Sequence, residues 1–324
     1  MIYPNFLKEN DTIGITALSS GVGRKLDSFD ESIQNIQKQG FQTIESKNVR
    51  NNAEPSSSAI DRANQFKELL VNKDIDAIFC AAGGDFQVET MPYINFDEIK
   101  KHPKWLLGAS DPTNLLFPVT CACDIATLYG FNGGSFDNYG INTYSQACFD
   151  FLKGENNTLT SSDIHQDVDF FNDGAPILNT KTEYLGEVDC SGRIIGGCFE
   201  SINDLAGTPF DYVKQFNERY KSDGIIWFFD VFSMNSCDLY RALLKMKVLD
   251  YFKYTKAILV GRVLFKNESE LISYQEAFHR ACPDIPIIME TDIGHTYPHL
   301  YIINGSYAHI KVKDGKGQFT YELK

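Results

Sequence analysis

Short apolar runs alternate with segments of helical period through the first 137 residues. The apolar runs in TIGITALSS (12–20), IDAIFCAAGG (75–84) and KWLLGAS (104–110) predict buried strands. The segments SFDESIQNIQKQG (28–40) and DRANQFKELLVNKD (61–74) space their apolar residues as amphipathic helices do. This alternation predicts an α/β fold, in which helices cover a parallel sheet.

A polar stretch rich in Asn, Asp, Ser and Thr follows, and alternation then resumes. We predict a first domain over 1–137, a connector over 138–189 and a second domain over 190–324. The second domain is expected to be mixed α/β, with strands in DGIIWFFDVF (223–232), TKAILVGRVLF (255–265) and IPIIMETDIGH (285–295). The Asn304-Gly305 pair predicts a hairpin-like turn near the end of the chain.

Polar residues follow three of the predicted strands of the first domain, in SSGVG (19–23), GGDF (83–86) and GASD (108–111). Ligands of parallel sheets bind at the carboxyl ends of strands. Gly83 and Gly84 would let the backbone approach a ligand closely, and their amides with the N–H of Asp111 could complete an oxyanion site. SSGVG has only two of the three glycines of a dinucleotide fingerprint, so no nucleotide cofactor is expected.

Ser110 stands where the chain turns from a strand into a helix, and this position has two interpretations. A serine there would be presented beside the free N–H groups of a helix start, as nucleophiles of acyl-transfer enzymes are. A serine or aspartate at the same position also caps helices, and this is the more common role. Pro112 occupies the place of the second glycine of a GxSxG elbow, so other residues must decide.

A nucleophilic serine needs a base and a carboxylate that orients the base. Of six histidines, His295 follows an apolar strand at a glycine-marked strand end, where a loop would present it for proton transfer. Asp230 ends the most hydrophobic strand of the second half and must be paired or reach solvent, although it could equally cap the next segment. Asp292 and Glu290 compete for this role, but residues so close to His295 in a strand alternate between faces.

Charge and cysteine content narrow the class of partner. The net charge of -13 argues against nucleic acid or an anionic membrane, which basic clusters bind, and favours a small molecule or peptide. Charged residues precede any apolar run at the amino terminus, and no window approaches the about 20 apolar residues of a membrane helix, so we expect a cytoplasmic protein. The eight cysteines lie mostly in apolar segments, as buried reduced thiols do, and no pattern predicts a metal site.

Six segments in this order resemble the serine LD-carboxypeptidase (muramoyltetrapeptide carboxypeptidase) family, which includes the microcin C immunity peptidases. The resemblance covers nearly the whole chain. The segments are LKENDTIGITALSS (7–20), RANQFKELLVNKDIDAIFCAAGGDF (62–86), GASDPTNLL (108–116), GRIIGGCFESI (192–202), DGIIWFFD (223–230) and IPIIMETDIGH (285–295).

The resemblance implies a catalytic mechanism and an architecture. Ser110 would be the nucleophile, His295 the general base, and Asp230 would stand in place of the family's glutamate. The amides of Gly84 and Asp111 would bind the oxyanion, without a cofactor or metal. The family fold implies two α/β domains with the active site in the groove between them, and a homodimer. The remaining substrate contacts would come from Gly83, Asp85, Phe86 and Cys198.

Three functions fit this set of residues. The first is release of a terminal D-amino acid from cytoplasmic muropeptides during peptidoglycan recycling, which an Arg or Lys near the site would favour. The second is cleavage of a peptidyl or aminoacyl nucleotide, as in microcin immunity, which an aromatic platform such as Phe86, Phe232 or Tyr297 would favour. The third is a binding protein whose chemistry is weakened because Asp230 is one methylene shorter than glutamate. Ala109 and Cys198 also depart from the family's usual aromatic residue and asparagine, which would change substrate contacts.

Overall fold

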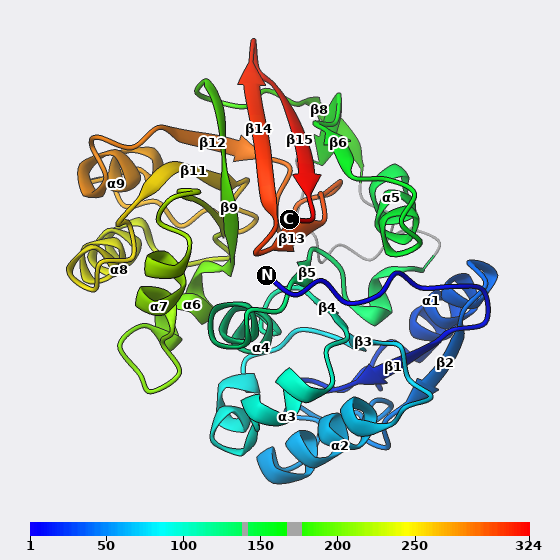
Figure 1. The fold of residues 1–324 in the computed structure, drawn as a ribbon. Helices are drawn as coiled ribbons and strands as arrows, with labels where there is room; N and C mark the ends of the chain where they lie inside the picture. The colour runs from blue at the N-terminus through cyan, green and yellow to red at the C-terminus, as the bar shows by residue number, and fades with distance from the viewer. Residues whose placement is uncertain (138–141, 167–176) are drawn as a thin grey trace. The chain divides into compact units, whose positions relative to one another are not determined.

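The computed structural model describes residues 1–137, 142–166 and 177–324 (Figure 1). The chain divides into two compact units, each with its own main sheet and buried core. Unit 1 comprises residues 1–157 and 301–304, and unit 2 comprises 158–300 and 305–324.

Unit 1 is built on a six-stranded sheet in the order β13-β5-β4-β3-β1-β2. The strands β2, β1, β3, β4 and β5 are parallel, and β13 pairs antiparallel with β5 at the edge. The strands are β1 (Thr12–Thr16), β2 (Gln42–Glu45), β3 (Ala77–Cys80), β4 (Trp105–Gly108), β5 (Thr127–Tyr129) and β13 (Ile302–Asn304). The parallel sheet predicted for the first domain is confirmed.

The crossovers of unit 1 are helical, as parallel pairing requires. The α-helices are α1 (Leu26–Lys38), α2 (Ala59–Val71), α3 (Phe96–Lys101), α4 (Thr113–Pro118) and α5 (Thr143–Leu152). Shorter helical turns are η1 (Gln87–Tyr93), η2 (Val119–Cys123) and η3 (Gly133–Ser135). The helix α2 begins at Ser58, whose side chain accepts a hydrogen bond from the N–H of Asp61. Its buried face includes Arg62, which is important below.

Unit 2 is built on a seven-stranded sheet in the order β12-β11-β10-β9-β14-β15-β6. The first four are parallel, and β14, β15 and β6 are antiparallel, which confirms a mixed α/β unit. These strands are β12 (Ile287–Thr291), β11 (Thr255–Gly261), β10 (Ile225–Asp230), β9 (Val188–Cys198), β14 (Tyr307–Lys313), β15 (Lys316–Glu322) and β6 (Thr158–Thr160).

An interior strand of unit 2, β10, is buried along its whole length because its neighbours β9 and β11 cover both edges and aromatic side chains pack on it. Trp227 stacks on Phe229 and Tyr251, with ring centroids 5.5 and 5.6 Å apart. The helices of unit 2 are α6 (Phe199–Leu205), α7 (Val213–Arg219), α8 (Ser236–Val248) and α9 (Tyr274–Ala281), and a separate ribbon pairs β7 (Ile164–Gln166) with β8 (Leu178–Lys181).

The predicted turn at Asn304-Gly305 is not a hairpin. The strand before it, β13, pairs with β5 in unit 1, whereas β14 pairs with β9 in unit 2, so the chain passes from one unit to the other here. The hairpin at the end of the chain is β14–β15, whose turn is Asp314-Gly315, with φ of 52° and 74°. The Asn304-Gly305 and Asp314-Gly315 pairs are the same kind of turn signal. The prediction at Asn304-Gly305 was wrong because such a signal does not specify which strand pairs with which.

The division into units also differs from the predicted domain boundaries. Residues 142–157, placed in the predicted connector, carry α5 and belong to unit 1, where Phe149 packs on Phe136. Residues 158–166 and 177–189 contribute strands to unit 2. The remaining positions of the predicted connector, 138–141 and 167–176, lie outside the described residues.

None of the helices in the described part of the chain is long and apolar enough to cross a membrane.

Candidate active site

Ser110 lies in a strained turn between β4 and α4 of unit 1. Its φ of 67° is left-handed, which is uncommon for a residue with a Cβ and is typical of functional sites. Its N–H donates to the hydroxyl of Tyr129 at 3.2 Å, and the N–H of Ala109 donates to Oδ1 of Asn132 at 3.0 Å. Its Oγ makes no hydrogen bond within the described chain, and the residue before α4 is Pro112. Ser110 is therefore not a helix cap, and its hydroxyl is available for chemistry.

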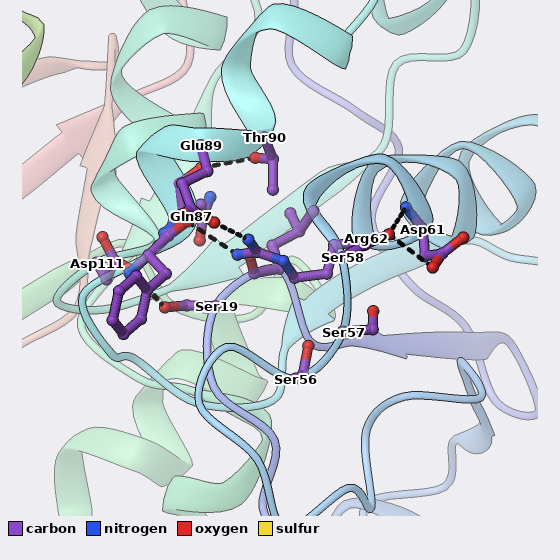
Figure 2. Close-up of polar contacts among 12 residues, drawn as sticks. Ser19, Ser56, Ser57, Ser58, Asp61, Arg62, Gln87, Glu89, Thr90 and Asp111 are labelled. Atoms are coloured by element: carbon purple, nitrogen blue, oxygen red, sulfur yellow. Dashed lines mark hydrogen bonds and ion pairs between the residues drawn. The ribbon is translucent and has the colours of Figure 1, made fainter.

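The carboxylate of Asp111 joins the serine turn to two other loops of unit 1. It is 5 % exposed and accepts hydrogen bonds from the hydroxyl of Ser19, the N–H of Gln87 at 2.8 Å and Nδ2 of Asn114 at 2.7 Å. Figure 2 shows Asp111 with Ser19 and Gln87. Burial raises the pKa of Asp111, and these three donors oppose the rise. The sequence suggested only the backbone N–H of Asp111 as functional, and the role of its side chain was missed.

The glycine loop, residues 83–86, packs directly against Ser110. A Cβ on Gly83 would lie 3.0 Å from Cβ and 3.3 Å from Oγ of Ser110. Gly84 has a φ of 137°, and a Cβ there would collide with the hydroxyls of Ser19 and Ser20. The N–H groups of Gly84 and Asp111 have no hydrogen-bond acceptor among the residues described, so both are available as oxyanion donors.

In unit 2, His295 and Asp230 form a close pair. Nδ1 of His295 lies 3.0 Å from Oδ1 and 2.9 Å from Oδ2 of Asp230. Asp230 ends β10 and its side chain is 1 % exposed, whereas that of His295 is 16 % exposed. Nε2 of His295 makes no hydrogen bond to any described residue. The pair thus has an oriented imidazole with one nitrogen left for proton transfer.

Gly294 lets the shorter carboxylate reach the imidazole. Its φ is 99°, and a Cβ there would collide with the carboxylate of Asp230. A residue with a side chain at position 294 would keep the backbone next to His295 farther from Asp230. Asp230 therefore contacts His295 directly, although its side chain is one methylene shorter than that of glutamate.

The charges around His295 favour its protonated form. Burial alone would lower the pKa of His295, but the charge and hydrogen bond of Asp230, together with the charge of Glu200, raise it above its usual value. An environment that stabilises the imidazolium is what a general base needs after it has taken a proton.

Glu200, in the first turn of α6, fixes the loop that follows Asp230. Its carboxylate accepts hydrogen bonds from the N–H groups of Phe232 at 3.1 Å, Ser233 at 3.0 Å and Met234 at 3.0 Å. The ring of Phe232 packs against the imidazole of His295, with centroids 4.6 Å apart. Glu200 was missed from the sequence, because an acidic residue in a first helical turn is common and carries no sign of a distant loop.

The competing carboxylates have other partners. Asp292 is buried in an ion pair with Arg262 and accepts hydrogen bonds from Tyr184 Oη at 3.0 Å and the N–H of Ser162 at 2.7 Å. Glu290 is partly exposed, with Lys266 3.9 Å away. The partner of His295 is therefore Asp230.

The nearby cysteines are poor nucleophiles. Burial raises the pKa of the Cys80 thiol to about 12, and burial also raises the pKa of Cys198 well above its usual value. Cys198 donates a hydrogen bond to Glu200 at 3.4 Å and lies beside Asp230 in the β9–β10 register. No three His, Cys, Asp or Glu side chains gather as metal ligands in the described part of the molecule.

The predicted residues fall into two groups, each described within its own unit. Unit 1 brings together Ser110, Asp111 and the glycine loop, which includes the predicted substrate contacts Gly83, Asp85 and Phe86. Unit 2 brings together Asp230, His295 and Cys198.

Comparison with known proteins identifies the family. The model of the LD-carboxypeptidase N-terminal domain matches residues 13–130, and that of the LD-carboxypeptidase C-terminal domain matches residues 191–310. Together they cover more than half of the chain, which therefore belongs to the LD-carboxypeptidase family of peptidases.

Relatives carry two kinds of name. A putative carboxypeptidase of Vibrio cholerae is 25% identical over 315 residues, which cover 93% of this chain and 92% of the relative. The microcin C7 self-immunity protein MccF of Escherichia coli is 24% identical over 313 residues, which cover 91% and 88% of the two chains.

Solved structures confirm the fold. MccF in complex with aspartyl sulfamoyl adenosine matches with a TM-score of 0.83 at 22% identity, covering 100% of this chain and 99% of that chain. Muramoyltetrapeptide carboxypeptidase from Oxalobacter formigenes matches with a TM-score of 0.74 at 18% identity, covering 96% and 98%.

Replacing Asp230 by asparagine is expected to lower the pKa of His295. The substitution removes the charge that stabilises the imidazolium, while the burial that opposes protonation remains. NMR titration of the histidine ring signals in the full-length chain measures the change, and the signal of His295 is the one absent from His295→Gln.

Glu290→Gln is the matched control, because it also removes a carboxylate close to His295 in sequence but one that lies near Lys266 instead. The pKa of His295 should stay at its wild-type value in this variant. An unchanged pKa in Asp230→Asn would show that the carboxylate does not set the protonation of the histidine.

Proposed function

We propose that this chain is a serine peptidase of the LD-carboxypeptidase type, in which Ser110, His295 and Asp230 act as one catalytic triad. The observation that carries the proposal is the Asp230–His295 pair, at 2.9 Å, with Nε2 of the histidine left unbonded within the described chain. The strained turn that presents the unbonded Oγ of Ser110 supports it from the other unit. The proposal requires that the two groups meet in a groove between the units.

In the proposed mechanism, Nε2 of His295 accepts the proton of Ser110 while Oγ attacks the amide carbonyl carbon. The negative charge moves to the carbonyl oxygen, which accepts hydrogen bonds from the N–H groups of Gly84 and Asp111. Asp230 stabilises the imidazolium, which then protonates the leaving amine as the C–N bond breaks. His295 next removes a proton from water, whose oxygen attacks the acyl carbon. The bond between that carbon and Oγ then breaks, His295 returns the proton to Oγ of Ser110, and the acid is released.

Direct contact between Asp230 and His295 favours an enzyme over a binding protein with weakened chemistry. The predicted disadvantage of the shorter carboxylate was a lost contact to the histidine. Because Gly294 allows close approach, the carboxylate lies at ordinary hydrogen-bond distance from Nδ1.

The first substrate proposed is a cytoplasmic muropeptide from which a terminal D-amino acid is released during peptidoglycan recycling. Relatives named carboxypeptidase support this substrate. The proposal includes a cytoplasmic location, expected from the sequence pattern of the amino terminus, and a homodimer, which the family resemblance implies. The buried Arg62 and Arg262 donate to partners within their own units, so recognition of a terminal carboxylate would fall to other groups.

The second substrate proposed is an aminoacyl or peptidyl nucleotide, cleaved by the same mechanism. MccF is a relative by sequence, and a structure of MccF holds aspartyl sulfamoyl adenosine. Of the three aromatic candidates for a purine platform, Phe232 already packs on His295, and Phe86 shares the glycine loop with Gly84, one of the two proposed oxyanion donors.

An alkyl fluorophosphonate probe is expected to label Ser110 of the wild-type chain. Oγ would attack phosphorus, the P–O bond would form as the P–F bond breaks, fluoride would leave and His295 would take the proton. Labelling should vanish in Ser110→Ala and slow by about a thousandfold or more in His295→Gln. Mass spectrometry of the intact and digested protein gives the site and the rate.

Ser191→Ala is the control for this experiment. Ser191 lies 3.3 Å from Nδ1 of His309, whose Nε2 is 3.0 Å from Asp189, so an exposed Ser–His–Asp contact exists on the β9–β14 surface. Its labelling rate should equal that of the wild type. A label that persists in Ser110→Ala, or is lost in Ser191→Ala, would contradict the assignment.

Asp230→Glu is expected to slow labelling of Ser110 by about tenfold or more. The longer side chain has no room beside Gly294 and would displace the imidazole from its productive position. Asp189→Glu, the same change on the exposed surface, should have no effect. Faster labelling in Asp230→Glu would show that the shorter carboxylate is a handicap.

Substrate assays separate the two proposed substrates. We expect the purified protein to release D-alanine from a muramoyl tetrapeptide, or to hydrolyse an aminoacyl sulfamoyl adenosine, with the activity lost in Ser110→Ala. Liquid chromatography with mass detection measures both reactions. Labelling of Ser110 with neither substrate cleaved would leave the serine chemistry in place and remove both substrate proposals.

A further inference from the structure

A guanidinium lies fully buried behind the glycine loop. Arg62, on α2, is 0 % exposed and donates from Nη1 to the carbonyl oxygens of Leu18 at 2.7 Å and Phe86 at 2.8 Å. Its Nη2 donates to Glu89 at 2.6 Å (Figure 2). One side chain thus holds the chain that follows β1 and the chain that follows β3.

The residue after each of these two carbonyls donates a hydrogen bond to the carboxylate of Asp111. The carbonyl of Leu18 is followed by Ser19, whose hydroxyl donates to Asp111. The carbonyl of Phe86 shares its peptide group with the N–H of Gln87, which donates to the same carboxylate at 2.8 Å. Arg62 and Asp111 therefore both bind the same two chain segments, Leu18–Ser19 and Phe86–Gln87, and the hydrogen bonds form a closed ring.

This ring polarises the Phe86–Gln87 peptide group, which lies between the two charges. A cation at the carbonyl oxygen and an anion at the N–H of the same peptide, as for Phe86–Gln87, strengthen both hydrogen bonds. The end of the glycine loop is held by Arg62 through the carbonyl of Phe86 and by Asp111 through the N–H of Gln87. The position of Gly84 relative to Ser110 depends on both.

Stability alone does not account for a buried guanidinium here. Its carboxylate partner, Glu89, is 48 % exposed, and Nε of Arg62 has no hydrogen-bond partner among the residues that the structure describes. Such a partly compensated charge costs free energy that a well-packed apolar residue would not. What the guanidinium provides, and an apolar residue cannot, is a planar set of donors that fixes two carbonyls at once.

We propose that Arg62 is a positioning residue for the oxyanion site: by fixing the separation of the turn at Ser19 and the glycine loop, it directs the N–H of Gly84 toward the substrate carbonyl oxygen that becomes the oxyanion when Ser110 attacks. This inference rests on the proposed function. Arg62 itself touches neither the substrate nor the reacting atoms. Its loss should therefore slow the chemical step more than it weakens binding.

The fluorophosphonate reaction separates these two effects, because its dependence on probe concentration gives a binding constant KI and a maximal rate kinact. In the full-length chain, Arg62→Met should lower kinact by about tenfold or more, with KI within about twofold of wild type. Arg62→Lys keeps the charge but not the planar fork, so its kinact should be intermediate.

Arg193→Met is the matched control. Arg193 is also buried, and its guanidinium also donates to one carboxylate and two carbonyls, namely Asp223 at 2.7 Å, Gly305 at 3.1 Å and Lys324 at 2.7 Å. In the register of β9 and β10, Arg193 lies beside Ile225, which is at the opposite end of β10 from Asp230. Its replacement should lower the thermal midpoint as much as Arg62→Met but leave kinact unchanged.

Three results would overturn the inference. They are a wild-type kinact in Arg62→Met, an effect of Arg62→Met confined to KI, or an equal loss of kinact in Arg193→Met. If Arg62→Met does not fold, Arg62→Lys decides, and a wild-type kinact in that variant rejects the proposal. Failure of the proposed function is distinct, because wild-type Ser110 would then not be labelled at all, and this inference would fall with it.

Discussion

A buried carboxylate must find hydrogen-bond donors, and in unit 1 the carboxylate of Asp111 finds them on two separate loops. This requirement brings the Ser19 turn and the chain at Gln87 against the turn that carries Ser110. The remaining local features follow from that arrangement. A Cβ on Gly84 would collide with the hydroxyls of Ser19 and Ser20 and one on Gly83 would crowd Ser110, and Ser110 adopts its left-handed conformation within the same cluster. A charged, buried group therefore acts as the organiser of a site whose chemistry it does not itself perform.

The same principle operates in unit 2, with a different result. Asp230 is almost inaccessible at the end of a fully buried strand, and its charge is compensated by His295. The charge and hydrogen bond of Asp230 raise the pKa of the histidine above its usual value despite burial, so that the imidazolium is stabilised once the imidazole has taken a proton. Gly294 provides the close approach on which the contact depends. Glu200 completes the arrangement by holding the loop that packs Phe232 on the imidazole.

Much of the fold could be predicted from the sequence, and the residues proposed for catalysis could be named from it, because both rest on local signals. Apolar runs predicted the strands, and Ser110, Asp230 and His295 each stand directly after such a run. The groups that hold them could not be predicted. Arg62 reads as an ordinary helix residue, Glu200 as a first-turn acid, and the contacts that matter join residues 24 to 44 positions apart in the case of Arg62. The prediction of a hairpin at Asn304-Gly305 was wrong for a related reason, since the residues of a turn do not reveal which sheet each flanking strand will join.

Catalysis by the proposed triad requires Ser110 of unit 1 and His295 of unit 2 to act on the same substrate. The most direct test is a crystal structure of the full-length chain after reaction with a fluorophosphonate. We predict a phosphorus atom bonded to Oγ of Ser110, its oxygen accepting hydrogen bonds from the N–H groups of Gly84 and Asp111, and Nε2 of His295 within about 3 Å of that Oγ. An adduct on another residue, or an imidazole of His295 beyond the reach of Ser110, would contradict the account.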